Sequence, residues 1–253
     1  MAKIVKLTTF DLRFPTSDHL DGSDAMNPDP DYSAAYVIIE TDNSLLKGHS
    51  FAFTLGRGND LCCEAIKALQ HLVLGLDISW IKENQSTFSR MMTSDTQLRW
   101  VGPEKGIIHM ASGAIINAVW DILAKSENKP IWQLVSDMSP EQISGSIDFR
   151  HITDFLNKDE AIEILCSHHK TKQYRVSKLE KEGYPCYVTS AGWLGYSDEK
   201  LKRLCIEAKE SGFEYVKLKV GKNLKDDMRR LEIARTTLGP DIKIMIDANQ
   251  VWE

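Results

Sequence analysis

The last third of the chain limits the fold most, because strand-like and helix-like segments alternate there at regular spacing. Strand-like runs occur at 187–190, 214–220 and 242–248, separated by helical runs at 197–210 and 224–238. Strands joined through helices in this way lie parallel in one sheet. The order predicts a βαβαβ unit, which begins either a doubly wound sheet or a (β/α)₈ barrel.

The length of this segment sets a second limit. A complete barrel needs eight strands and about 250 residues, whereas only about 70 residues follow Tyr184. If the segment belongs to a barrel, roughly five βα units are absent from the chain. We therefore expect the (β/α)₈ barrel to be incomplete, with the third strand as an unpaired edge.

The first 130 residues follow a different pattern, with strands first and helices afterwards. Strands are predicted at 4–14, 34–40 and 45–53, and helices at 59–74, 79–92 and 103–125. Asn59 or Asp60 is the predicted N-cap of the first helix. This order is typical of an α+β module. The predicted domains are 1–130, a connecting segment at 131–183, and the partial barrel at 184–253.

Composition excludes some classes of protein. The 253 residues carry 31 basic and 36 acidic side chains, a net charge of −5, so a nucleic-acid partner is not expected. The sequence contains no run of about 18 apolar residues, so a membrane span is not expected. The five cysteines lack paired spacing, which favours reduced thiols in an intracellular protein.

Two lysines stand out in the second strand of the βαβαβ segment. Side chains alternate along a strand, so Lys217 and Lys219 share one face. Both faces of a parallel sheet are normally covered, and burial disfavours an ammonium group. Such lysines suit a site that binds an anion or needs a base. An edge strand with solvated lysines is the alternative.

Two oxygen-bearing side chains end the third strand. Asp247 and Asn249 share a face at its carboxyl end, where α/β folds place their sites. Mg²⁺ prefers carboxylate oxygens, so Asp247 is a candidate metal ligand. The alternative is an aspartate that only caps a following helix. Together, the two strands predict lysines and a carboxylate in one polar mouth, suited to a carboxylate substrate that loses its α-proton.

At these residues the chain resembles a known family. Lys217-Leu218-Lys219 and Asp247-Ala248-Asn249 look like the Lys-x-Lys and first metal-ligand motifs of the enolase superfamily, mandelate racemase branch. Further segments are similar to the L-fuconate dehydratase group, closest to its animal, mitochondrial-type members: NPDPDYSAAY at 27–36, FTLG at 53–56, LRWVGPEKG at 98–106, AGWLGY at 191–196 and DDMRR at 226–230.

The resemblance implies a capping domain at 1–130 whose loops, near 15–31 and 54–58, close over a sugar-acid substrate. It implies that Lys219 is the acid/base at the α-carbon and that Lys217 helps to neutralise the substrate carboxylate. It also implies Asp247 as a Mg²⁺ ligand, with a hydro-lyase reaction that converts L-fuconate to a 2-keto-3-deoxy acid and water. Further substrate contacts are expected from a set of four side chains: Asp24, Tyr32, Trp100 and Asn249.

The chain departs from the family pattern in one respect. The family needs two further acidic metal ligands and a His–Asp pair on later strands, and none can be placed before Glu253. One carboxylate would bind Mg²⁺ weakly. We therefore expect a truncated form with little or no dehydratase activity.

Several alternatives stay open. The motifs do not separate L-fuconate dehydration from a racemase or a dehydratase of another sugar acid. A non-catalytic truncated isoform that acts by interaction is the reading from a different class. Resemblance favours a mitochondrial location over a cytoplasmic one, although no presequence is evident, and a homo-oligomer is left open.

Overall fold

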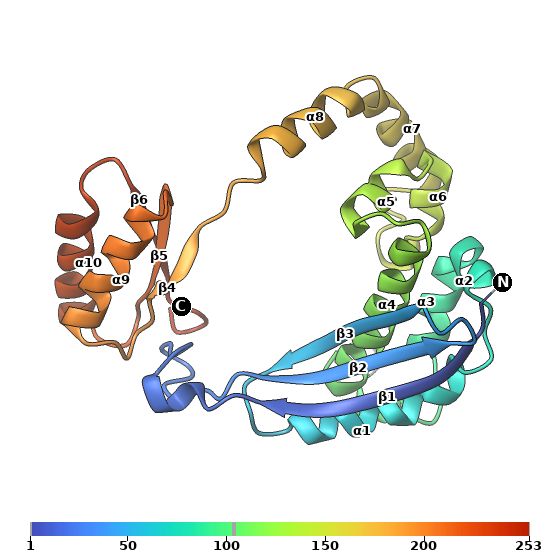
Figure 1. The fold of residues 1–253 in the computed structure, drawn as a ribbon, viewed down its shortest axis with the longest axis horizontal. Coiled ribbons are helices and arrows are strands. Elements are labelled where there is room, and N and C mark those ends of the chain that lie inside the picture. Colours follow the sequence, from blue (N-terminus) through green and yellow to red (C-terminus); the bar gives the residue numbers. More distant parts are fainter. Residues whose placement is uncertain (1, 103–104, 253) are drawn as a thin grey trace. The chain divides into compact units, whose positions relative to one another are not determined.

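A computed structural model describes residues 2–102 and 105–252 (Figure 1). The chain divides into two compact units, one formed by residues 1–12 and 33–178 and the other by residues 13–32 and 179–253. We call them the first and the second unit and describe each by itself.

The first unit contains a three-stranded sheet of order β1-β2-β3. Its strands are β1 (Ile4–Arg13), β2 (Ser33–Thr41) and β3 (Lys47–Thr54). The strands predicted at 34–40 and 45–53 are confirmed and form a hairpin, since β2 and β3 pair antiparallel with Val37 opposite Ser50. Every second residue of β2 is buried, as expected for a strand with one face on the core.

Helix α4 (Ile107–Ser126) is the central helix of the first unit. It lies directly against β3 at Gly48, where a Cβ atom would come within 2.0 Å of the Ala118 carbonyl oxygen. Glycine is therefore required for this contact. By length and composition α4 could cross a membrane, but more than half of its most apolar stretch is buried. Packing in the core accounts for this apolar composition.

Shorter helices surround this core: α1 (Asn59–Leu69), η2 (Gln70–Leu72), α2 (Ile78–Glu83), α3 (Gln85–Thr93) and η3 (Arg99–Val101). The single helix predicted at 79–92 is wrong, because the backbone breaks at Asn84 between α2 and α3. The predicted cap at Asn59 or Asp60 is also wrong. Gly58 occupies the N-cap, while the buried Asn59 side chain bonds Thr54 and Asp11.

The segment from 131 to 182 is largely helical, and this includes 159–181, where the charged sequence has a helical pattern. It forms α5 (Ile131–Asp137), α6 (Pro140–Gly145), η4 (Phe149–His151), α7 (Lys158–His169) and α8 (Lys172–Glu182). Side-chain caps on Ser139 and Asn157 begin α6 and α7. The predicted start of the central helix at Pro103 lies outside the described residues.

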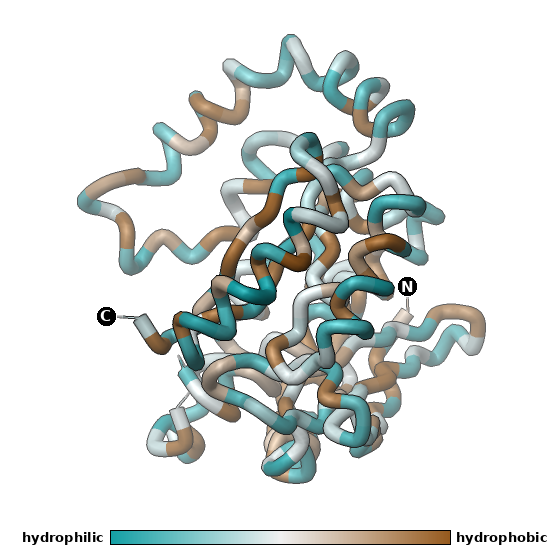
Figure 2. Tube along the Cα trace, turned by 90° about the vertical axis from the view of Figure 1, so that its left-hand side faces the viewer, coloured by the Kyte–Doolittle hydropathy of each residue, from teal (hydrophilic) through white to brown (hydrophobic). Residues whose placement is uncertain are grey.

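The second unit confirms the predicted βαβαβ order. Strands β4 (Val188–Gly192), β5 (Tyr215–Lys219) and β6 (Lys243–Asp247) pair in parallel, joined by α9 (Asp198–Glu210) and α10 (Leu224–Leu238). The Ser197 side chain caps α9 by accepting a hydrogen bond from the Lys200 N–H. Hydropathy along the chain shows apolar residues recurring at intervals along helices rather than in long runs (Figure 2).

The core of the second unit lies between β5 and the two helices. Val216 and Leu218 are fully buried, and they pack with Leu201, Cys205 and Ala234. Strand β6 is an edge among the described residues, and Ile246 on it is 49% exposed. The opposite face of β5 carries the polar residues described next.

Candidate active site

Two lysines, Lys219 buried and Lys217 partly buried, form the centre of the candidate site. Lys217 and Lys219 alternate with the core residues of β5, and their side chains are only 16% and 9% exposed. The alternative of solvated lysines on an edge strand is therefore wrong. An ammonium group removed from water needs compensating partners, and the neighbouring strand supplies one.

That partner is Asp247 at the carboxyl end of β6. Its Oδ2 lies 3.0 Å from Lys217 Nζ and 2.7 Å from Lys219 Nζ, while Oδ1 accepts a hydrogen bond of 2.9 Å from the Asn249 N–H. The Lys219 ammonium and the Asn249 N–H hold the pKa of Asp247 far below its ordinary value. The carboxylate is thus ionised and is shared by both lysines.

Asn249 joins the same cluster. Its Oδ1 accepts a 3.0 Å hydrogen bond from Lys219 Nζ. The backbone at Asn249 has a φ of 52°, in the left-handed region that asparagine tolerates better than most residues. The structure therefore brings Lys217, Lys219, Asp247 and Asn249 together, as the alternation of the two strands predicted.

Two aromatic residues complete the cluster, and sequence reasoning did not single out either. Lys217 Nζ donates to Tyr187 Oη at 3.2 Å and lies 4.7 Å from that ring's centroid, and Lys219 Nζ lies 5.8 Å from the Trp193 ring. Burial alone would lower the pKa of Lys217, but hydrogen bonds to Asp247 and Tyr187 outweigh it and raise the pKa. The only signal was the aromatics' position flanking the neighbouring strand β4.

A buried arginine lies beneath the lysines. Arg230 of α10 is 1% exposed, and its guanidinium donates to the carbonyls of Lys219 at 2.7 Å, Trp193 at 2.8 Å and Gly192 at 3.2 Å. Burial lowers the pKa of Arg230. This side chain ties the carboxyl ends of β4 and β5 together where they carry Trp193 and Lys219, so it fixes the floor of the site.

The loop at 13–32 belongs to the second unit and is anchored there. It contains η1 (Thr16–His19). Ser23 accepts hydrogen bonds from the Leu194 N–H at 3.0 Å, through its carbonyl, and from the Gly195 N–H at 2.9 Å, through its hydroxyl. Asp21 bonds the Tyr196 hydroxyl and lies 2.9 Å from Lys200 Nζ. These contacts hold the loop beside the turn after β4.

Tyr32 and Asp24 of this loop have different surroundings. The Tyr32 ring lies edge-on to Trp193, with centroids 6.1 Å apart, so it is one aromatic contact from Lys219. Burial, and to a smaller extent Asp24, raises the pKa of Tyr32. The Asp24 Oδ1 accepts hydrogen bonds from the N–H groups of Met26 and Asn27, both at 2.7 Å, which fold the loop upon itself.

Trp100 lies in the first unit, on η3, and is 85% exposed. The predicted substrate contacts of Trp100, Asp24, Tyr32 and Asn249 stay predictions.

The described residues do not by themselves fit a Mg²⁺ site. Residues 2–102 and 105–252 contain no group of three or more His, Cys, Asp or Glu side chains placed to hold a metal. The carboxylate of Asp247 is one ligand, and two ammonium groups within 3.0 Å of its Oδ2 oppose a second cation. Mg²⁺ requires near-octahedral oxygen coordination. This chain therefore offers at most part of such a site.

Comparison with known proteins identifies the class. Residues 29–136 match the family described as "Mandelate racemase / muconate lactonizing enzyme, N-terminal domain", and residues 200–253 match "Enolase C-terminal domain-like". The chain belongs to the enolase superfamily, with an N-terminal capping domain followed by part of its barrel.

The similar proteins are more specific. The chain is 51% identical over 252 residues to mitochondrial enolase superfamily member 1 of Xenopus laevis, covering 99% of this chain and 57% of that protein. The crystal structure of the human protein of that name, 49% identical, has a TM-score of 0.96 and is covered to 57% of its length by this chain. L-galactonate dehydratase of Hypocrea jecorina is 48% identical, covering 96% of this chain and 54% of that protein.

A more distant structure has the same fold. L-talarate/galactarate dehydratase from Salmonella typhimurium, crystallised with Mg and L-lyxarohydroxamate, is 22% identical with a TM-score of 0.65. The match covers the whole of this chain but only 52% of the chain in that structure. The chain thus spans little more than half the length of these relatives, and the family to which it belongs includes acid-sugar dehydratases.

Proposed function

We propose that this chain is part of a Mg²⁺-dependent acid-sugar dehydratase acting on L-fuconate. The observation that carries the proposal is the cluster of Lys217 and Lys219 around Asp247, on a chain 48% identical to L-galactonate dehydratase. L-Fuconate is 6-deoxy-L-galactonate, so the two substrates share the carboxylate and the stereocentres where dehydration occurs. The predicted domains at 1–130, 131–183 and 184–253 are part of this proposal.

The reaction makes separate demands on the two lysines. The amine of Lys219 takes the proton from the carbon beside the carboxylate, and the ammonium of Lys217 offsets negative charge on that carboxylate. The electron pair released at the α-carbon forms a double bond to the β-carbon as the bond from that carbon to its hydroxyl breaks. The hydroxyl leaves as water with the proton that Lys219 has taken up, and the enol then shifts its hydroxyl proton to the β-carbon, which gives a 2-keto-3-deoxy acid. Tyr187 and Arg230 hold the lysines in place.

Mg²⁺ enters the proposal only through Asp247. We propose that this carboxylate is one metal ligand in a protein of the relatives' full length, where further ligands come from residues outside this sequence. In the 253-residue chain both lysines already bond Asp247 Oδ2, and no other carboxylate in the described part of the chain joins them at a metal site. We therefore propose that this chain alone has little or no dehydratase activity.

The test compares two proteins side by side. The 253-residue chain and a version extended to the relatives' length are incubated with Mg²⁺ and L-fuconate, L-galactonate or galactarate, and 2-keto acids are measured. We expect the extended version to form 2-keto-3-deoxy-L-fuconate and the shorter chain to form none. Comparable turnover by both would contradict the proposed inactivity. Preference of the extended protein for another acid would contradict the proposed substrate.

A matched pair of variants tests the roles of the lysines in the extended protein. Lys219→Met should lower the turnover number by about 10³-fold or more. Lys217→Met should lower the turnover number and also weaken substrate binding, because it removes a charge that faces the carboxylate. Lys202→Met on the exposed face of α9 is the control and should change neither. Equal, small effects at all three positions would exclude the proposed lysine roles.

We also propose a mitochondrial location, supported by the names of the similar proteins. Cell fractionation with an antibody against this sequence tests it. Recovery in the cytosolic fraction alone would contradict the proposal.

A further inference from the structure

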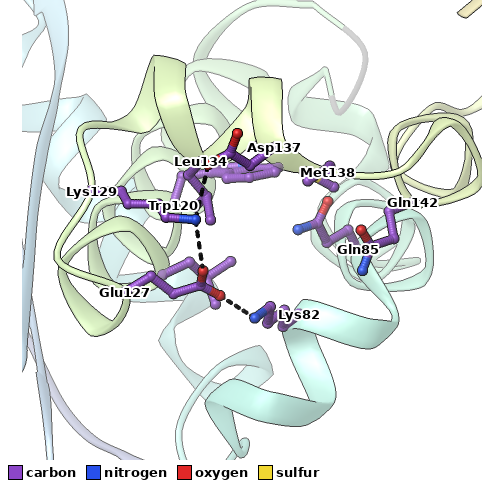
Figure 3. A pocket seen from close by; sticks show the side chains of 10 residues that line it. Lys82, Gln85, Trp120, Glu127, Lys129, Leu134, Asp137, Met138 and Gln142 are labelled. Atoms are coloured by element: carbon purple, nitrogen blue, oxygen red, sulfur yellow. Dashed lines mark hydrogen bonds and ion pairs between the residues drawn. The ribbon is translucent and has the colours of Figure 1, made fainter. Parts of the chain in front are cut away.

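A separate cavity lies within the first unit, where it is not part of the lysine cluster. It has a volume of about 180 Å³, is partly open to solvent, and is lined by side chains from α2, α3, α4, α5 and α6 together with the turn after α4 (Figure 3). A cavity of about 150 Å³ is large enough for benzene. This one therefore has room for a small ring-bearing molecule.

One polar side chain in the cavity wall lacks a partner. Gln85, at the start of α3, is 8% exposed, and among the described residues no group bonds its buried Oε1. Its amide is directed into the space that the other side chains surround (Figure 3). An unpaired buried amide oxygen costs about 1–3 kcal/mol, so proteins rarely leave one without a ligand or water.

The neighbouring wall is apolar. Leu123 and Leu134 are almost completely buried, and Trp120 and Met138 complete this side of the cavity. An aromatic ring and a thioether provide a flat, polarisable surface. The wall therefore suits a ring, while the Gln85 amide suits the polar edge of the same molecule.

The charged residues at the cavity are already paired with one another. Lys82 bonds Glu127, and Lys129 lies 3.7 Å from Glu127 and 2.9 Å from Asp137, as the dashed lines in part show (Figure 3). Asp137 also pairs with Lys172 at 3.0 Å. Each cation and each carboxylate that lines the cavity has an opposite charge beside it. The cavity thus favours a neutral ligand over an ion.

From these features we infer that the cavity is a binding site for a small, neutral, planar carboxamide. A carboxamide presents a donor and an acceptor side by side, which is the complement of the Gln85 amide. Rotation about the last side-chain torsion of Gln85 exchanges its oxygen and nitrogen, so the paired hydrogen bonds form in either orientation. The ring attached to the carboxamide would lie against Trp120, Leu134 and Met138.

Benzamide is the probe for the test, with toluene as a ring without a polar edge and benzoate as a ring with a charge. The 253-residue chain carries ¹³C-methyl methionine, and the Met138 methyl resonance, assigned with Met138→Leu, is followed as each probe is added. We expect a saturable shift with benzamide and weaker binding of benzoate, because a buried anion has no free cation to pair with.

The decisive variant is Gln85→Met, which keeps the length of the side chain and removes the amide. We expect its affinity for benzamide to fall about tenfold, the loss of one or two hydrogen bonds, while toluene binds as before. Gln70→Met, the same change at an exposed position, is the control and should not alter binding.

Folding of the variant is checked by its melting temperature. Removing an unpaired amide should leave this temperature unchanged or raise it, and a large fall would show that Gln85 is already satisfied within the protein. Absence of a benzamide-induced shift would mean that only water fills the cavity. Equal benzamide affinity in the original chain and in Gln85→Met would show a non-specific apolar space. Each of these three results overturns the inference.

Discussion

Strands β2 and β6 carry similarly apolar side chains but bury them to different extents. Val37 and Ile39 on β2 are fully buried, because β2 is flanked by β1 and β3 and lies against α4. Ile246 on β6 is half exposed, because β6 is paired only with β5 in the described part of the chain. The apolar pattern of a segment therefore identifies it as a strand, whereas the strands and helices packed against that strand decide how much of it is buried.

The largest effect is expected at the tightest contact of the first unit. Gly48→Val would place a Cβ 2.0 Å from the Ala118 carbonyl oxygen, and backbone must move to relieve the overlap. We expect the free energy of unfolding of this unit to fall by about 4 kcal/mol, above the usual range for an overpacked core. Hydrogen exchange by mass spectrometry measures it unit by unit. An equal loss in the second unit would show that the two do not unfold separately.

The corresponding change in the second unit removes the buried arginine. Arg230→Met leaves the carbonyls of Gly192, Trp193 and Lys219 without their donor, which should lower this unit's free energy of unfolding by about 3 kcal/mol. Urea denaturation followed by hydrogen exchange gives the value. Arg203→Met on the exposed side of α9 is the control, and a similar loss there would contradict a special role for Arg230.

Two matched substitutions that shorten a side chain, one in β2 and one in β6, test whether the two strands differ in burial. Val37→Ala in β2 should lower the free energy of unfolding by about 2 kcal/mol, because it creates a cavity in a closed core. Ile246→Ala in β6 removes more atoms but should lower it by less than about 1 kcal/mol, since much of that side chain is already in water. If the β6 variant lost as much, β6 would be covered in solution.

A further small effect concerns pH. The folded pKa of Asp247 is lowered, so its carboxylate stabilises the second unit at pH values above its unfolded pKa, about 4. This contribution, about 1 kcal/mol, is lost as the pH falls through the lower folded pKa. Asp247→Asn should therefore be less stable than the original chain at pH 6, and the difference should shrink progressively as the pH falls below about 4. A difference that does not change with pH would exclude this linkage.

The regular elements were predictable because periodicity is local. Alternation in 214–220 placed both lysines on one face of β5, and the spacing of the strands predicted a parallel sheet. Arg230 and Tyr187 were not predicted, because their roles depend on which distant carbonyl or ammonium group each contacts. The prediction of Asn59 as a helix cap was wrong because its side chain bonds Thr54 and Asp11, contacts that only the folded chain shows.

The division of the chain at 12, 32 and 178 has a practical consequence for dissecting the molecule. The polypeptide passes between the two units three times, so a single protease cut at 12 or 32 leaves them covalently joined, whereas a cut at 178 releases residues 179–253 without the 13–32 segment of the same unit. A plasmid encoding residues 179–253 alone would lack the 13–32 segment, and with it Ser23 and the Asp21 carboxylate that binds Tyr196 and Lys200. Expression of the second unit by itself therefore requires 13–32 to be fused back through a designed linker.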